Sequence, residues 1–167
     1  IYQEKAHKRL KSWGMNTFGN WSDTETYMLR KTPYTVSVNF RWKQVGGKLK
    51  FPNVYHPEYK TNLKNAFLNH KETWNDAWCI GYFVDNELHG WGAIGNHVLT
   101  SSANDNAKVE LIEFLKKKYS QVAQLNRNWE TSYESWESLL NTTQKVMGKV
   151  ASADLLEFEK LMVALYY

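Results

Sequence analysis

The sequence contains little cysteine and proline, and it has no long apolar run. Among its 167 residues are one cysteine and three prolines, and no apolar stretch approaches the ~20 residues needed to cross a membrane. The single Cys79 excludes an internal disulfide, and its place inside an apolar segment predicts a buried thiol. Because the chain opens directly into charged, helical sequence, we expect no secretory signal within it. We therefore expect one ordinary soluble domain with no membrane span.

Metal-ligand spacing is also missing. His56, His70 and His97 have no such spacing with one another or with Cys79. We expect neither a metal site nor a cofactor.

The charge balance is mildly basic and scattered. There are 21 basic and 17 acidic residues, which gives a net charge of +4. The only basic run, at residues 116–118, lies near a predicted helix C-terminus, where cations favour the helix dipole. A solvated helix end explains this run better than a nucleic-acid patch, so we expect no nucleic-acid partner.

Aromatic residues are abundant. The chain has 8 Trp, 10 Tyr and 7 Phe, which together make 15% of the sequence. Aromatic faces serve carbohydrate sites as flat apolar platforms, but most such rings pack in cores because they bury large areas. Only aromatic residues at strand ends therefore support a functional interpretation.

The first half of the chain alternates helices with strands. Charge, periodicity and turn residues predict helices, strands and one loop with a possible hairpin. Such an order favours right-handed crossovers and a parallel sheet. The predicted elements are a helix over 5–13 ended by Gly14, a strand over 15–21, a helix over 24–30 capped by Ser22 or Asp23, a strand over 34–40, the loop over 43–55, a helix over 57–74 and a strand over 79–84.

The second half is predicted to be helical after a polar loop. The loop covers residues 90–106, and helices are expected over 107–119, 122–128, 133–140 and 153–167. Three parallel strands cannot close an eight-stranded barrel, and the sequence stops in apolar residues without a cap. We therefore expect a part of a barrel. A small open α/β domain is the alternative, although its sheet would leave both edges exposed.

A polar triplet at the end of the last predicted strand is the most informative feature. Residues 79–84 are apolar or small on both faces, which predicts a parallel strand covered on two sides. Asp85, Asn86 and Glu87 follow at once. In barrels of parallel strands, the C-terminal strand ends carry the chemistry. A Glu there suits acid/base work on a glycosidic bond, and Asn86 either hydrogen-bonds a sugar hydroxyl or forms a turn.

Other polar and aromatic residues follow the same strand ends. Trp21 either stacks on a sugar ring or packs under the loops, and His89 either lines a subsite or is a plain exposed histidine. Asp85 is better explained by a structural role. The candidate substrate-binding residues are Asn86, Asn20, Trp21, Asn39, Arg41, His89 and Trp91.

Four motifs carry a resemblance to a known family. They are residues 9–22 (RLKSWGMNTFGNWS), 80–88 (IGYFVDNEL), 114–119 (FLKKKY) and 125–129 (LNRNW). The chain resembles the middle of glycoside hydrolase family 50, the β-agarases, and more distantly the family 42 β-galactosidases. Their clan consists of retaining (β/α)8 glycosidases in which an Asn-Glu pair ends the fourth strand. The resemblance implies that Glu87 is the catalytic acid/base and that Asn86 hydrogen-bonds the 2-hydroxyl.

The resemblance also implies an architecture and partners. By this resemblance, residues 1–167 are an α/β fragment of one catalytic TIM barrel and comprise about strands two to four. A helical insertion is expected at about 107–141, and the nucleophile is expected outside the chain. The implied partners are a galactose-containing polysaccharide or oligosaccharide, and either the remainder of the barrel or a second copy. A secreted or periplasmic location is implied too. The alternatives are a non-catalytic carbohydrate-binding or structural fragment, and a β-galactosidase of the same clan.

Overall fold

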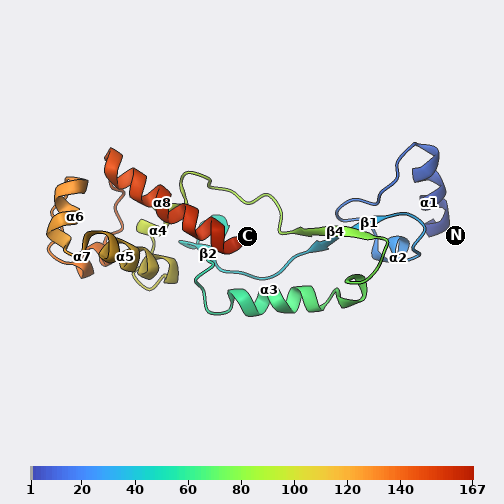
Figure 1. The fold of residues 1–167 in the computed structure, drawn as a ribbon, viewed down its shortest axis with the longest axis horizontal. Helices are drawn as coiled ribbons and strands as arrows, with labels where there is room; N and C mark the ends of the chain where they lie inside the picture. The colour runs from blue at the N-terminus through green and yellow to red at the C-terminus, as the bar shows by residue number, and fades with distance from the viewer. Residues whose placement is uncertain (1) are drawn as a thin grey trace. The chain divides into compact units, whose positions relative to one another are not determined.

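The chain folds into two compact units. The computed structural model describes residues 2–167, and its elements mix helix and strand (Figure 1). Unit 1 comprises Ile1–Arg41 and Asn62–Asn86, and unit 2 comprises Trp42–Thr61 and Glu87–Tyr167. Each unit is therefore assembled from two separate stretches of sequence.

Unit 1 is built on a parallel pair of strands. β1 (Tyr34–Val38) pairs with β4 (Cys79–Val84), and Val38 lies opposite Val84 at the end of both. Phe18 adds a parallel bridge to Tyr34 on the other side of β1. The expected parallel arrangement is thus present. The strand expected over 15–21 is only this bridge, because the chain turns immediately afterwards, where Ser22 N–H donates to Gly19 O at 3.3 Å.

Three helices and a short 3₁₀ turn complete unit 1. Asp23 caps α2 by accepting the Thr26 N–H at 2.9 Å, and Gly14, with φ +74°, follows α1. Both caps were predicted. The helix expected over 57–74 is instead a shorter helix followed by the 3₁₀ turn. The bounds are α1 (Tyr2–Ser12), α2 (Thr24–Tyr27), α3 (Tyr59–Leu68), which begins in unit 2, and η1 (Lys71–Thr73).

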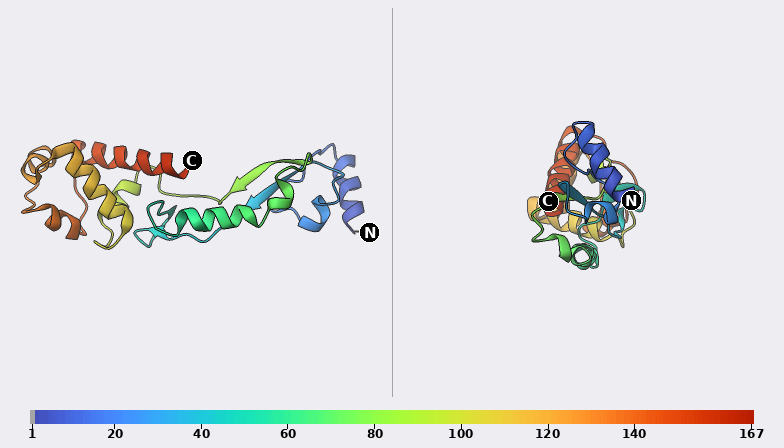
Figure 2. Two further views of the ribbon diagram at one scale, coloured as in Figure 1. Left: turned by 60° about the horizontal axis from the view of Figure 1, so that its bottom comes forward. Right: turned by 90° about the vertical axis from the view of Figure 1, so that its right-hand side faces the viewer.

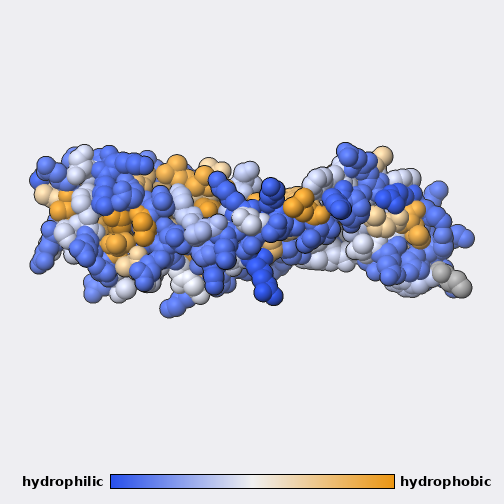
Figure 3. Space-filling view, turned by 90° about the horizontal axis from the view of Figure 1, so that it is seen from below, coloured by the Kyte–Doolittle hydropathy of each residue, from blue (hydrophilic) through white to orange (hydrophobic). Residues whose placement is uncertain are grey.

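The sheet of unit 1 is covered on one face only. Tyr34, Val36 and Val38 of β1 are buried together with Tyr27 and Ala66. On β4, however, Ile80 is 61% exposed and Phe83 is 53% exposed. The prediction that β4 is buried on both sides is therefore wrong for this chain, because its helices pack on a single face. Cys79 is half-buried rather than enclosed. Apolar side chains reach the surface among hydrophilic ones in Figure 3.

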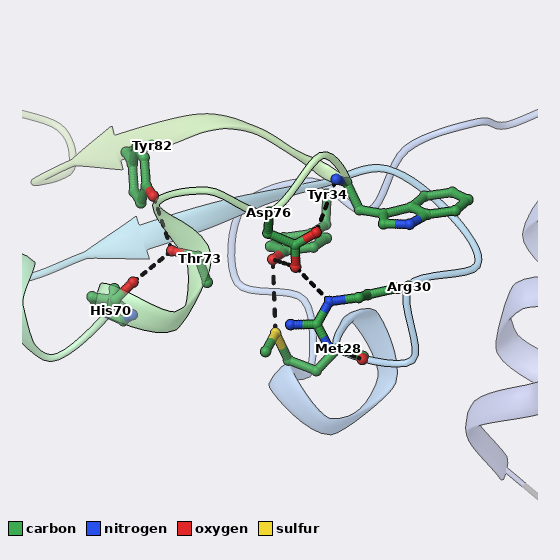
Figure 4. Close-up of polar contacts among 8 residues, drawn as sticks. Met28, Arg30, Tyr34, His70, Thr73, Asp76 and Tyr82 are labelled. Carbon is green, nitrogen blue, oxygen red and sulfur yellow. Dashed lines mark hydrogen bonds and ion pairs between the residues drawn. The ribbon is translucent and has the colours of Figure 1, made fainter.

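A polar network fixes the N-terminal end of the strand pair (Figure 4). The Asp76 carboxylate accepts hydrogen bonds from Tyr34 Oη at 2.7 Å, Arg30 Nε at 2.8 Å and Trp78 N–H at 3.0 Å. These donors hold the pKa of Asp76 below its usual value, with the Trp78 backbone N–H as the largest cause. Burial, reinforced by the bond to Asp76, raises the pKa of Tyr34. The network ties the segment before β4 to the start of β1.

Unit 2 is a helical cluster with one β-hairpin. β2 (Gln44–Val45) and β3 (Leu49–Pro52) pair antiparallel across a turn at Gly46 and Gly47, both at positive φ, as the loop with a possible hairpin predicted. The polar loop expected over 90–106 contains a helix, because Ile94, Val98 and Leu99 form a buried apolar stripe. The helices are α4 (Ile94–Leu99), α5 (Asn106–Tyr119), α6 (Val122–Trp129), α7 (Trp136–Asn141) and α8 (Lys149–Tyr166).

The core of unit 2 is closed and contains paired polar groups. α8 packs against α4, α5 and α6, and it runs beside α4 in Figure 1 and in the left view of Figure 2. Buried Asp154 of α8 accepts hydrogen bonds from Tyr119 Oη at 2.6 Å and Trp129 Nε1 at 2.7 Å, and Lys118 Nζ lies 2.9 Å away. Burial and the bond to Asp154 raise the pKa of Tyr119 to about 12. Fully buried Lys108 donates to the carbonyls of Ser101 and Thr142. These bonds satisfy the polar groups that the helices bring inside.

The hairpin is joined to the helices through Asp105. This residue caps α5 by accepting the Ala107 N–H at 2.9 Å. Its two carboxylate oxygens also accept hydrogen bonds from Asn53 Nδ2 at 2.8 Å and Gly46 N–H at 3.2 Å. One carboxylate therefore fixes β2, β3 and the start of α5 together.

Candidate functional site

The backbone that follows β4 adopts an unusual conformation. Asp85 and Glu87 both have left-handed conformations, with φ of 58° and 51°. Non-glycine residues rarely adopt such angles, and where they occur they often mark functional positions. Asp85 N–H still donates to Val38 O at 3.1 Å, so the pairing with β1 extends one residue beyond β4. The chain then leaves the sheet through Asn86 and enters unit 2 at Glu87.

Two candidate residues of unit 1 follow the same edge of the sheet. Val38 and Val84 are register partners, so Asn39 and Asn86 both come after the carboxyl ends of paired parallel strands. Asn39 Nδ2 donates to Ser37 Oγ at 3.0 Å. Arg41 is exposed, and its backbone carbonyl accepts Asn62 Nδ2 of α3 at 3.1 Å. The parallel register thus places polar side chains at one edge.

Asn20 and Trp21 follow the third parallel segment. The bridge before them pairs Phe18 with Tyr34, the first residue of β1. Trp21 has φ 62° and its ring is largely exposed. Across residues 2–167, nothing donates a hydrogen bond to the buried Asn20 Oδ1. The exposed Trp21 ring can stack on a sugar, whereas the Asn20 Oδ1 is buried and does not face solvent.

Glu87 lies beside the hairpin of unit 2. Its side chain is 71% exposed, and its Oε2 lies 4.0 Å from Lys50 Nζ of β3. An exposed ion pair at this distance adds little stability, so Glu87 is not held in place as a structural group. His89, which is also exposed, donates its backbone N–H to Lys50 O at 3.0 Å. The segment after Glu87 therefore runs alongside β3.

Trp91 forms an exposed aromatic surface in the same loop. Its ring is 52% exposed and meets the buried Phe51 of β3 edge to face, at 5.5 Å between centroids. Phe51 also contacts Tyr166 of α8 at 5.8 Å. A half-exposed indole supported from below is the kind of platform on which a sugar ring stacks.

Three residues that support this loop were not predicted from the sequence. Lys50 and Phe51 fell in a region expected to be a loop with a possible hairpin, and Glu159 fell in the final helix. Glu159 is only 4% exposed, and its Oε1 accepts Gly92 N–H at 2.5 Å. A signal for it was present, because Glu159 falls on the stripe formed by Leu155, Phe158 and Met162. A carboxylate on an apolar stripe needs a buried partner.

Two features of the described residues bear on the class of site. Of the helices in the described chain, none is long and apolar enough to cross a membrane. Within residues 2–167, no cluster of three or more His, Cys, Asp or Glu side chains could hold a metal ion.

Comparison with curated proteins confirms the resemblance to β-agarases. The chain is 29% identical over 165 residues to β-agarase A of Vibrio sp. (strain JT0107), which covers 83% of this chain and 16% of the relative. It is 24% identical over 192 residues to β-agarase B of the same strain, which covers 100% of this chain and 20% of the relative. The chain thus spans about one fifth or less of these relatives. No family model matches it.

Solved structures give the same result for the fold. The agarase AgWH50C is 24% identical with a TM-score of 0.85, PfGH50B is 26% identical with 0.88, and an exo-β-agarase is 23% identical with 0.87. Each match covers 99% of this chain and 25–26% of the solved chain. The chain therefore has the mixed helix–strand fold of one part of these proteins. Its similarity is to β-agarases of glycoside hydrolase family 50, as its motifs predicted.

Proposed function

We propose that this chain supplies the acid/base half of a retaining glycoside hydrolase that cleaves β-galactosidic links in agarose-type polysaccharide. The observation that carries the proposal is the end of β4. A parallel strand, in register with β1, runs into Asn86 and an exposed Glu87, and the chain is similar throughout to part of β-agarases. The proposal makes β1, β4 and the Phe18 segment three neighbouring strands of a (β/α)8 barrel.

In this mechanism Glu87 acts twice. It first protonates the leaving glycosidic oxygen, and it then removes a proton from the water that hydrolyses the glycosyl-enzyme. Asn86 hydrogen-bonds the sugar beside the reacting carbon. The nucleophilic carboxylate is expected outside this chain, on the remainder of the barrel, since retaining enzymes need a second carboxyl group ~5–5.5 Å from the first.

The remaining candidates bind the polysaccharide in this proposal. Trp21 and Trp91 offer exposed rings for stacking, and Asn20, Asn39 and Arg41 offer polar groups. His89 follows Glu87 by two residues and lines the same loop. The exposed side chains Ile80 and Phe83 on β4 are the surface on which the remainder of the barrel or a second copy packs.

The test is Glu87→Gln in a full-length protein that contains this chain. The amide keeps the size of the side chain but cannot donate the proton, so turnover of agarose should fall by about 10²–10⁴-fold. Glu134→Gln, at an exposed position between α6 and α7, is the matched control and should leave turnover unchanged. Unchanged turnover in Glu87→Gln, with agarose still bound, would favour a non-catalytic carbohydrate-binding role. Preference for simple β-galactosides over agarose would favour a β-galactosidase.

A further inference from the structure

Glu159 is a buried carboxylate for which the proposed reaction has no direct use. It projects from α8, is 4% exposed, and accepts Gly92 N–H at 2.5 Å through Oε1 and Gly95 N–H at 3.5 Å through Oε2. Both donors belong to the segment between Glu87 and α4. A buried carboxylate is costly unless it is hydrogen-bonded, so these bonds to the loop are what keeps it inside.

The bonds are made where α4 and α8 approach each other most tightly. A Cβ added to Gly95 would lie 2.3 Å from Leu155 O of α8. The backbone of α4 therefore rests directly on the backbone of α8, one turn before Glu159. Gly95 cannot move away without breaking this packing. The positions of α4 and α8 are therefore fixed relative to each other, and Glu159 accepts the Gly92 N–H from a fixed position.

The loop held in this way carries the exposed aromatic ring. Trp91 directly precedes Gly92 and lies against Phe51, which in turn contacts Tyr166 of α8. On the other side of Trp91, a Cβ on Gly90 would lie 2.5 Å from the Leu49 side chain. The loop is thus fixed on both sides of the indole, by β3 before it and by Glu159 after it.

We propose that Glu159 is a positioning residue that presents Trp91 as a rigid sugar-stacking platform. The proposal rests on the carbohydrate function proposed above. We expect this positioning to strengthen sugar binding, because a platform that is ordered before binding loses less conformational entropy when the sugar stacks on it. Glu159 does not touch the sugar. It acts through Gly92, and its contribution disappears when the indole is absent.

The first experiment needs no substrate. In a full-length protein that contains this chain, amide hydrogen exchange at Gly92 should become at least about tenfold faster in Glu159→Ala, the effect of losing one net hydrogen bond. Glu159→Gln keeps a carbonyl acceptor and should restore most of the protection. Glu157→Ala, exposed on the same helix, is the control and should change nothing at Gly92. Unchanged exchange at Gly92 in Glu159→Ala would overturn the proposal whatever the chain binds.

The second experiment measures sugar binding by following the Trp91 indole N–H during titration with an agaro-oligosaccharide. Glu159→Ala should raise the dissociation constant several-fold, with Glu159→Gln closer to the unaltered chain. The double variant with Trp91→Ala should bind no more weakly than Trp91→Ala alone, because coupled residues are not additive. Fully additive effects would overturn the positioning role. Failure of the unaltered full-length protein to bind the oligosaccharide would instead contradict the carbohydrate function.

Discussion

The two units differ in the charged side chains that they bury and in how their sheets are covered, although both leave some large apolar side chains exposed. Unit 2 buries charged and polar side chains, such as Lys108, Asp154 and Glu159, and gives each a partner. Unit 1 leaves large apolar side chains of its sheet, Ile80 and Phe83, in solvent. A closed helical cluster can satisfy its buried groups by itself. A two-stranded sheet with helices on one face cannot cover its second face, so that face is available for an interaction.

The largest effect is expected from the buried network of unit 2. Asp154→Ala removes the acceptor for Tyr119 Oη and Trp129 Nε1 and leaves both buried donors unpaired. The free energy of unfolding should fall by about 4 kcal/mol. Denaturant titration followed by tryptophan fluorescence measures it. Glu157→Ala breaks only an exposed pair with Lys118 and should cost less than about 1 kcal/mol. Equal losses in the two variants would show that the network is not the main support of the cluster.

The next largest effect is the loss of stability on replacing a glycine, which we compare between Gly95 of unit 2 and Gly81 of unit 1. Gly95→Ala forces a methyl group against the backbone of α8 and should destabilise the chain by about 3 kcal/mol. Gly81→Ala adds a methyl group to β4, where no atom lies within 4 Å, and should leave stability nearly unchanged. Thermal unfolding of the two variants provides the comparison. A large loss for Gly81→Ala would mean that the outer face of the sheet is covered in solution.

A smaller effect distinguishes the two faces of the sheet in unit 1. Val36→Ala opens a cavity in the buried face and should cost about 2 kcal/mol. Ile80→Ala removes more apolar atoms, but from an exposed face, and should cost less than half as much. Both values come from urea titration at low protein concentration. If the cost of Ile80→Ala grows as protein concentration rises, a second copy covers this face.

The smallest effect is the response of unit 1 to acid. The folded pKa of Asp76 is lower than its unfolded value of 3.8, so the carboxylate contributes stability above that pH. This contribution is lost as the pH falls through the lower folded value. The difference in unfolding free energy between the unaltered chain and Asp76→Asn should therefore shrink between about pH 5 and pH 2. A difference that stays constant with pH would rule out Asp76 as the titrating group.

Features that depend on neighbouring residues in the sequence could be predicted, and features that depend on distant contacts could not. The bounds of β4, the helix end at Gly14, a cap at Ser22 or Asp23 and a parallel sheet were predicted, whereas the hairpin between residues 44 and 52 was only a possibility within a predicted loop. α4 was missed because Gly90, Gly92 and several polar residues surround its short apolar stripe. The exposure of Ile80 and Phe83 was missed because an apolar strand looks the same whether or not another layer covers it.

The candidate site likewise combines residues predicted from the sequence with residues that only the structure brings near them. The roles of Glu87, Asn86 and the other candidates remain predictions, resting on the motif and on the resemblance to β-agarases. The structure adds that Asn39 and Asn86 follow the same sheet edge, because Val38 and Val84 are register partners. It also adds Lys50 and Phe51, which come near Glu87 and Trp91 only through the hairpin.

The sequence by itself determined the local order of helices and strands, the polar end of β4 and the likeness to β-agarases. These features depend on side-chain periodicity, caps and motifs, all of which are read within a few residues. Only the tertiary structure decided which face of β4 is bare and which carboxylates are buried. It alone brought Glu159 to Gly92, 67 residues earlier in the chain. Such contacts depend on how α8 packs on α4. The apolar stripe of α8 marks Glu159 as a buried carboxylate, but nothing near it in the sequence identifies Gly92 as its partner.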